Sequence, residues 1–153
     1  MLLRLVFAVI VMVLATGGPS AQERQWSLDA GDQDAYLIFG VPDSDDVGVS
    51  LWCPVRQGAV NIFLPRVPEV AATVRLLTMT ITAEDQSAEF AGKMEENLDA
   101  GVSSVEGQLP ADHPIFKTLV KADRFHIKAG SVDEVFPLIE ADLAGLIELC
   151  RTD

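Results

Sequence analysis

The chain has 153 residues, with 11 Lys and Arg residues against 23 Asp and Glu residues, so its net charge at pH 7 is −12. So acidic a chain argues against binding to nucleic acid or to an anionic membrane, because both depend on neutralising phosphate charge. The charge favours solubility, or the binding of a basic or envelope protein. The length suits a single domain with a sizeable core.

The first 21 residues are expected to form a secretory signal peptide. Arg4 supplies a weak positive charge, an unbroken apolar run extends from Leu5 to Ala15, and small residues follow. This run is too short to span a bilayer comfortably, although an uncleaved membrane anchor is the alternative. We therefore expect residues 22–153 to be one β-rich domain that is periplasmic or secreted, without stable membrane insertion after cleavage.

The stretch from Ala35 to Cys53 predicts a β-hairpin around which the rest of the chain is organised. Apolar side chains alternate in both arms, at Ala35, Leu37, Phe39 and Val41 and again at Val47, Val49, Leu51 and Cys53. This period of two is the signal of a strand. The turn is expected at Pro42 to Asp46, since proline cannot donate to a ladder and the acids are costly to bury.

Further strands are expected on both sides of this hairpin. Upstream, the start is polar and Trp26 is its first apolar anchor. Downstream, the expected strands are Ala59–Leu64, Thr73–Thr82, Ser87–Glu95, Val102–Leu109, Arg124–Ala129 and Val132–Phe136. Pro65 and Pro68 are expected to end a strand, and a helical turn over Glu95–Leu98 is the alternative to one strand end. About eight short strands indicate an antiparallel β-sandwich or a flattened barrel.

Two helices complete the predicted fold, which is mainly β. Asp112 is expected to cap a short internal helix that reaches about Ala122. The C-terminal helix is amphipathic, with one apolar stripe made of Ile139, Leu143, Leu146, Ile147 and Cys150.

The chain has only two cysteines, Cys53 and Cys150. In an exported protein such a pair indicates one disulfide, and two buried free thiols are the alternative. A bond between them closes a loop of about 100 residues, for which the chain-entropy model gives roughly 4–5 kcal/mol as an upper figure. It would also attach the apolar stripe of the last helix to the sheet.

The hairpin AYLIFGVPDSDDVGVSLWC, Trp26, the segment LPADHPIF at 109–116 and the terminal cysteine together resemble a family of small exported alphaproteobacterial proteins with no established activity. The resemblance implies an all-β exported domain with Cys53 paired to Cys150, and it supplies no catalytic residues. In layout alone the chain is also similar to periplasmic lysozyme inhibitors. It lacks their Ser-Gly-x-x-Tyr loop, since Asp-Ala precedes its single tyrosine, Tyr36.

Sequence motifs indicate no catalytic residue, metal ligand or cofactor. Asp43, Asp45 and Gly48 match positions 1, 3 and 6 of a calcium loop, but Val47 and Pro54 fall where ligands are required. These acids are therefore interpreted as turn residues. No H-E-x-x-H, C-x-x-C, G-x-S-x-G or dinucleotide fingerprint occurs.

A short basic segment interrupts the acidic chain and gives the predicted binding residues Lys121, Arg124, His126 and Lys128. Lys117 and Lys121 are four residues apart on the expected helix. Arg124, His126 and Lys128 alternate with apolar residues and are expected on one face of a strand. Such a patch suits a carboxylate, a phosphate or an acidic partner. The alternative is a solvated face that balances its own acidic neighbours.

Trp52 is the remaining candidate for a partner surface. Trp52 and Phe63 point away from the expected core residues of their strands. One such aromatic would be exposed in a sandwich and would mark an interface, unless a second face is buried.

The first functional hypothesis is a non-enzymatic exported protein that binds an unidentified ligand or partner. An inhibitor of a basic hydrolase such as lysozyme is one version of it. The second hypothesis is an enzyme with an unrecognised site, for which His126 beside a carboxylate is the first place to look. The third is an envelope structural or assembly protein with an exposed apolar patch.

Overall fold

The computed structural model describes residues 23–67, 75–97 and 102–152. The expected signal peptide lies outside these residues, as do Pro68, Thr73 and the connection after Asn97.

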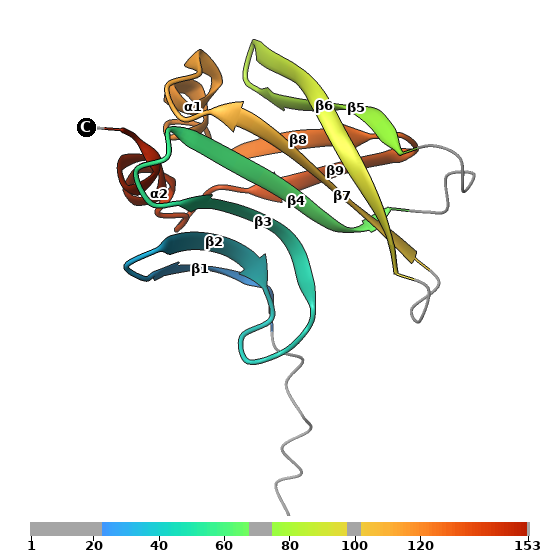
Figure 1. Cartoon of the computed structure of the whole chain (residues 1–153), viewed down its shortest axis with the longest axis horizontal. Helices are drawn as coiled ribbons and strands as arrows, with labels where there is room; N and C mark the ends of the chain where they lie inside the picture. Colours follow the sequence, from blue (N-terminus) through green and yellow to red (C-terminus); the bar gives the residue numbers. More distant parts are fainter. Residues whose placement is uncertain (1–22, 68–74, 98–101, 153) are drawn as a thin grey trace, which may run out of the picture.

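Over these described residues the fold is one sheet of nine antiparallel strands, curled into a half-barrel, with two short helices (Figure 1). The strands are β1 (Gln25–Ala30), β2 (Asp34–Gly40), β3 (Val47–Pro54), β4 (Ala59–Val67), β5 (Leu76–Ala83), β6 (Gln86–Asn97), β7 (Val102–Pro110), β8 (Arg124–Ala129) and β9 (Val132–Pro137). Their order in the sheet is β1-β2-β3-β4-β7-β6-β5-β8-β9. The predicted mainly β class is confirmed. The ninth strand is β1, where a polar start was predicted; its only residues packed against the core are Trp26 and Leu28.

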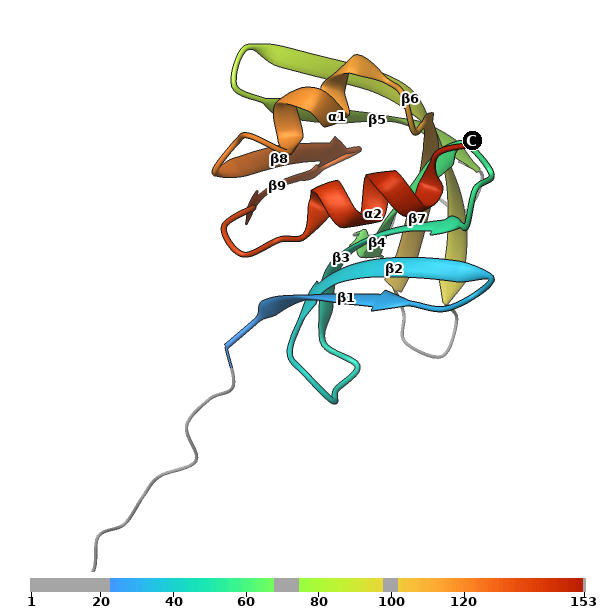
Figure 2. The same ribbon diagram turned by 90° about the vertical axis from the view of Figure 1, so that its left-hand side faces the viewer.

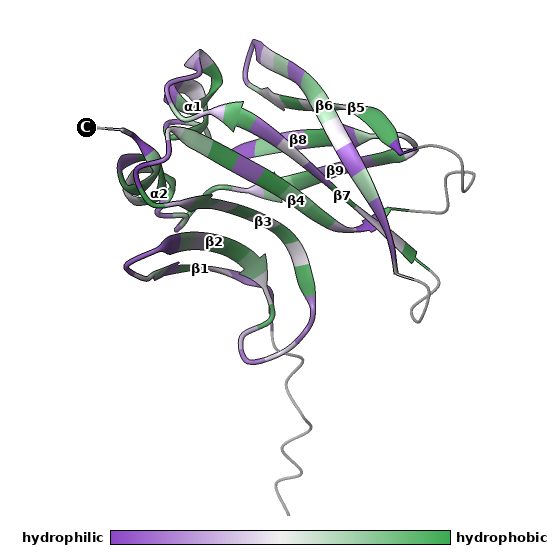
Figure 3. Ribbon diagram, viewed as in Figure 1, coloured by the Kyte–Doolittle hydropathy of each residue, from purple (hydrophilic) through white to green (hydrophobic). Residues whose placement is uncertain are grey.

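The alternation predicted for the strands is what builds the core (Figure 3). In the β2–β3 hairpin, Ala35, Leu37, Val49, Leu51 and Cys53 are all buried on the inner face. The turn between the arms is closed by a hydrogen bond from the Val41 N–H to the Asp46 carbonyl, 2.9 Å. One predicted boundary was wrong: β4 continues through Pro65 to Val67. The pairing with β7 shifts register between Leu64 and Val67, and this irregularity accommodates a residue that lacks an N–H donor.

Two glycines allow side chains of neighbouring strands to approach the backbone of β6 and β7 closely. Gly92 of β6 lies opposite Gly107 of β7, and both face inward. A Cβ added at Gly107 would lie 2.6 Å from the Phe90 ring, and one added at Gly92 would lie 2.7 Å from Met79 and Val105. Since side chains from neighbouring strands already occupy this space, only glycine permits so close an approach.

The two ends of the strand order meet through side chains. Trp26 of β1 donates its Nε1–H to the carbonyl of Pro137 in β9, with a distance of 2.6 Å. The same indole ring lies 5.1 Å from Phe39 and 6.5 Å from Phe125, between ring centroids. Trp26 is therefore an apolar anchor, as predicted, and it holds the β1 end of the half-barrel beside the β9 end.

Both helices lie at the same end of the half-barrel (Figure 2). The helix α1 (Pro114–Leu119) packs against β5 and β6, and α2 (Leu143–Cys150) packs against β2, β3 and β4. The predicted cap of α1 was wrong. Asp112 is exposed and lies one residue before the N-cap position. The N-cap residue is His113, whose Nδ1 accepts a hydrogen bond from the N–H of Ile115 at 3.2 Å. Ile139 also lies outside α2 and is 67% exposed, because Asp142 caps this helix.

The predicted disulfide between Cys53 and Cys150 is confirmed, with a Cα–Cα distance of 5.6 Å. It joins the end of α2 to β3. The turn after β3 adds two hydrogen bonds to the same helix end, from the Arg56 N–H to the Leu149 carbonyl and from the Gly58 N–H to the Cys150 carbonyl. These bonds satisfy carbonyl groups that the end of a helix leaves without partners. Within the described residues, neither helix is long and apolar enough to cross a membrane.

Candidate functional site

The basic strand β8 presents Arg124, His126 and Lys128 together on the outer face of the sheet. All three are exposed, whereas the alternating Phe125, Ile127 and Ala129 are buried in the core. The structure thus places these three predicted residues side by side, as the period of a strand requires.

These residues line an open hollow of about 480 Å³ on the sheet surface, together with Thr82, Ala83, Glu84 and Asp133. Thr82 lies opposite His126, and Asp133 lies opposite Lys128. The Lys128 ammonium is 3.5 Å from the Asp133 carboxylate, and both side chains are more than half exposed. The two fixed cations of the hollow, Arg124 and Lys128, are therefore matched by two carboxylates, Glu84 and Asp133. This charge balance fits the solvated-face interpretation better than an anion site.

Lys121 does not join this hollow. It lies with Lys117 in a second recess, between α1 and α2, of about 340 Å³. The chain reverses between α1 and β8, which separates residues that are close in sequence. The predicted basic segment is therefore split between two surfaces.

The recess between the helices, called here the α1–α2 groove, combines an apolar floor with a basic rim. Its lining is Phe116, Lys117, Val120 and Lys121 from α1 and the turn after it, and Ala144, Ile147, Glu148 and Arg151 from α2 and its C-cap. Within the described residues, Lys117 and Lys121 make no ion pair. Arg151 approaches Glu148 at 3.8 Å, with side chains that are 46% and 82% exposed. The groove thus has three cations and one acid, in a chain of net charge −12.

The groove is held in shape by the core beneath it. Phe116 and Ile147 are 1% and 4% exposed, so the floor is part of the hydrophobic core. The α2 side is fixed by the disulfide of Cys150. On the α1 side the helix ends at Leu119, earlier than predicted, but hydrogen bonds from the next turn continue from the Val120 N–H to the Phe116 carbonyl. Lys117 and Lys121 therefore remain on the same side.

Trp52 lies on the outer face of β3, five strands away from β8 in the sheet order, and is half-buried. Its ring stacks on Tyr36 with centroids 5.6 Å apart, and its Nε1–H donates to a Glu106 carboxylate oxygen at 2.8 Å. Its carbonyl accepts from the Asn61 amide. Neighbouring groups thus occupy one ring face and the polar edge, and Trp52 does not lie near the other predicted binding residues.

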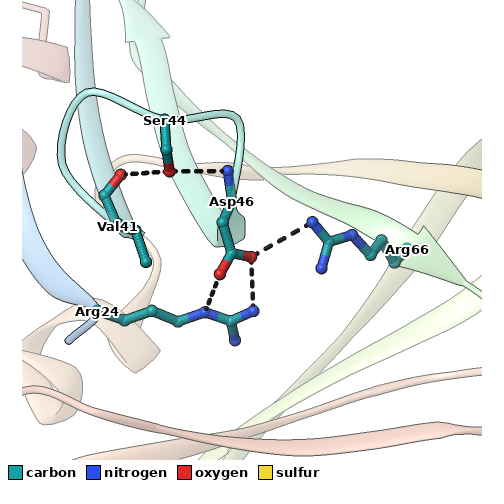
Figure 4. A network of polar contacts seen from close by, with 5 residues as sticks. All are labelled: Arg24, Val41, Ser44, Asp46 and Arg66. Carbon is teal, nitrogen blue, oxygen red and sulfur yellow. Dashed lines mark hydrogen bonds and ion pairs between the residues drawn. The ribbon is translucent and has the colours of Figure 1, made fainter. Parts of the chain in front are cut away.

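The acids of the β2–β3 turn are organised around arginine (Figure 4). Asp46 accepts from Arg24 Nη2 at 2.7 Å and Nε at 3.3 Å, and from Arg66 Nη2 at 3.3 Å. Its backbone N–H donates to Ser44 Oγ, which donates to the Val41 carbonyl. The hydrogen bond from Arg24 holds the pKa of Asp46 below its ordinary value, and the same bond raises the pKa of Arg24. This acid therefore has a structural partner, in line with the interpretation of the loop as a turn.

The α2 half of the groove was missed at the level of sequence. Ala144, Glu148 and Arg151 lie on the polar side of an amphipathic helix, where the pattern shows exposure but not which neighbour lies opposite. The sequence signal that could have indicated this groove is Val120, an apolar residue between Lys117 and Lys121. Its side chain is 44% exposed in the structure.

These features define a disulfide-linked, curled β half-barrel with a basic and apolar groove at its helical end. Comparisons with models of protein families, with curated proteins and with solved structures found no match to this chain. Within the residues that the structure describes, no three His, Cys, Asp or Glu side chains are grouped so as to hold a metal ion.

Proposed function

We propose that the protein is an exported, non-enzymatic binding protein whose ligand or partner presents anionic groups to the α1–α2 groove. Its disulfide is consistent with an oxidising, exported compartment. The apolar segment within residues 1–21, and the resemblance of the hairpin to small exported alphaproteobacterial proteins, support a periplasmic location.

The observation that carries this proposal is the charge of the groove. Three cations and one acid surround its apolar floor, while the whole chain has a net charge of −12. Cations that lack counter-charges attract carboxylates and phosphates from solution, and the surrounding acidic surface repels anions that do not reach the groove. The hollow at β8 lacks this excess, since its two carboxylates match Arg124 and Lys128.

The test is an affinity capture from periplasmic and envelope extract at low salt, with small molecules and proteins of the eluate both analysed. The double variant Lys117→Gln/Lys121→Gln removes two groove cations, and Lys128→Gln is the matched control at the hollow. We expect an anionic ligand or acidic partner that is retained by the wild type and the control and lost by the double variant. Retention that depends on Lys128 alone, or an eluate with no anionic component, contradicts the proposal.

The same experiment separates the other functional hypotheses. An inhibitor of a basic hydrolase would retain a basic protein through its acidic surface, at low salt and regardless of both lysine changes. An envelope assembly protein would retain a protein partner at high salt, through an apolar surface. An enzyme acting through His126 would convert a component of the extract, and His126→Gln would abolish that conversion.

A further inference from the structure

We infer that the ligand of the α1–α2 groove is a single-chain amphiphile with one anionic head group, such as a medium-chain fatty acid. The inference rests on the proposed function and assigns the chemical class of its ligand. Three features of the groove support it: the apolar floor, the basic rim and the size.

The floor is suited to a hydrocarbon chain. Its open surface belongs to Val120 and Ala144, which lie over the buried Phe116 and Ile147, and none of these four residues has a hydrogen-bonding side chain. Val120 is 44% exposed, among the few large hydrophobic side chains of the described residues with that much open surface. Covering it with a chain removes apolar area from water, whereas a sugar or an inorganic anion would leave polar groups against it without partners.

The rim is suited to one carboxylate or phosphate. Lys117 and Lys121 come from one side of the groove and Arg151 from the other. Because Glu148 lies 3.8 Å from Arg151, the two lysines are the cations left for a ligand. A lysine pair can hold one anionic head while the chain extends towards α2.

The size favours a small amphiphile over a folded partner. The groove encloses about 340 Å³, near the lower end of the roughly 300–1,000 Å³ typical of small-molecule sites. A protein interface needs several times the area that these eight residues offer. An acidic peptide would meet the same lysines, but its backbone would place unsatisfied polar groups on the apolar floor.

The experiment is a titration of the purified protein with octanoate and decanoate, each below its micelle concentration, followed by NMR shifts of the backbone amides of α1 and α2. We expect saturable binding, with decanoate tighter than octanoate by up to about fifteenfold, since each of its two additional methylenes contributes about fourfold when buried. The neutral 1-octanol is expected to bind more weakly than octanoate by about three- to tenfold, because it forgoes the ion pairs with the lysines.

Three variants locate the site. Lys117→Gln/Lys121→Gln should weaken octanoate to about the level of 1-octanol and leave 1-octanol unchanged. Val120→Gln should weaken both probes, since it places an amide on the floor. Lys128→Gln should change neither. All four positions are exposed, so the variants are expected to fold, and their thermal melts check this.

The outcomes separate this inference from the proposed function. If octanoate and decanoate do not bind, while the double lysine variant still loses an anionic partner from extract, the groove binds a different anionic ligand and the inference is overturned. The same holds if inorganic phosphate or an acidic peptide binds at the groove with equal strength. If the double lysine variant loses nothing in either experiment, both the inference and the proposed function fail.

Discussion

The disulfide permits the most quantitative prediction. The double variant Cys53→Ala/Cys150→Ala opens a covalent loop whose ends are 97 residues apart in sequence. In the chain-entropy model, a closed loop of about 100 residues stabilises the folded state by about 4.7 kcal/mol through its effect on the unfolded chain. Strain in the folded state and residual structure in the unfolded chain reduce this figure, so we expect a loss of about 2–4 kcal/mol. That is a large part of the roughly 5–15 kcal/mol by which domains are stable.

The native structure should survive the change. The hydrogen bonds from Arg56 and Gly58 to the end of α2 remain, and Leu143, Leu146 and Ile147 stay buried. The far-ultraviolet circular dichroism is therefore expected to be unchanged. The urea dependence of the unfolding free energy should increase, because the unfolded chain without the bond exposes more surface.

Urea unfolding of the wild type and the variant, each with and without reductant, is the measurement. The wild type should fall to the stability of the variant once it is reduced, and the variant should not respond to reductant. A loss below about 1 kcal/mol with an unchanged urea dependence would refute the entropic argument. Selective hydrogen exchange in α2, with the sheet intact, would show instead that the bond only fastens the helix.

Two further changes test the close packing at Gly107 and the arginine cluster. Gly107→Ala puts a Cβ 2.6 Å from an aromatic ring and should lower the free energy of unfolding in urea by about 1–3 kcal/mol. The control Gly31→Ala, whose Cβ would have its nearest neighbour at 3.4 Å, should change this free energy little. Equal stability of the two variants contradicts the role given to Gly107. Asp46→Asn should lower the melting temperature at pH 7, because the hydrogen bond from Arg24 holds the pKa of this carboxylate below its ordinary value. The stabilisation is present above that value and is lost as pH falls through the lowered folded pKa, so the difference from wild type should shrink in acid. The control Asp45→Asn, in the same turn but without an arginine contact among the described residues, should leave the melting temperature at pH 7 close to that of the wild type. A difference for Asp46→Asn that is constant down to acid pH would contradict the assignment.

The strands that could be predicted are those whose alternation is strong. In β2, β3 and β8 apolar residues that face the core alternate with residues that do not, and this period is visible without any knowledge of neighbours. The ends were less predictable. Pro65 lies within β4, and His113 rather than Asp112 caps α1, because a register shift and the exact start of a helix depend on what packs nearby. The strand β1 was missed since its apolar content is confined to Trp26 and Leu28.

The candidate site was predicted only in part. Arg124, His126 and Lys128 were correctly expected on one strand face, but the sequence does not show that Glu84 and Asp133 lie among them. Lys121 was grouped with them and lies instead across a groove from Arg151. Residues that are 30 positions apart meet there because two helices pack on the same end of a curled sheet.

The acidic charge, the β class, the amphipathic last helix and the pairing of the two cysteines could all be predicted from the sequence, because each depends on composition or on a period of a few residues. The curl of the sheet into a half-barrel is visible only in the folded chain, because it depends on how side chains of neighbouring strands pack, as at the paired Gly92 and Gly107. The folded chain is also needed to see which cations have a carboxylate nearby, as Lys128 has Asp133. Charge balance depends on distances across strands and between helices, and these are set by packing of the whole chain rather than by the order of its residues.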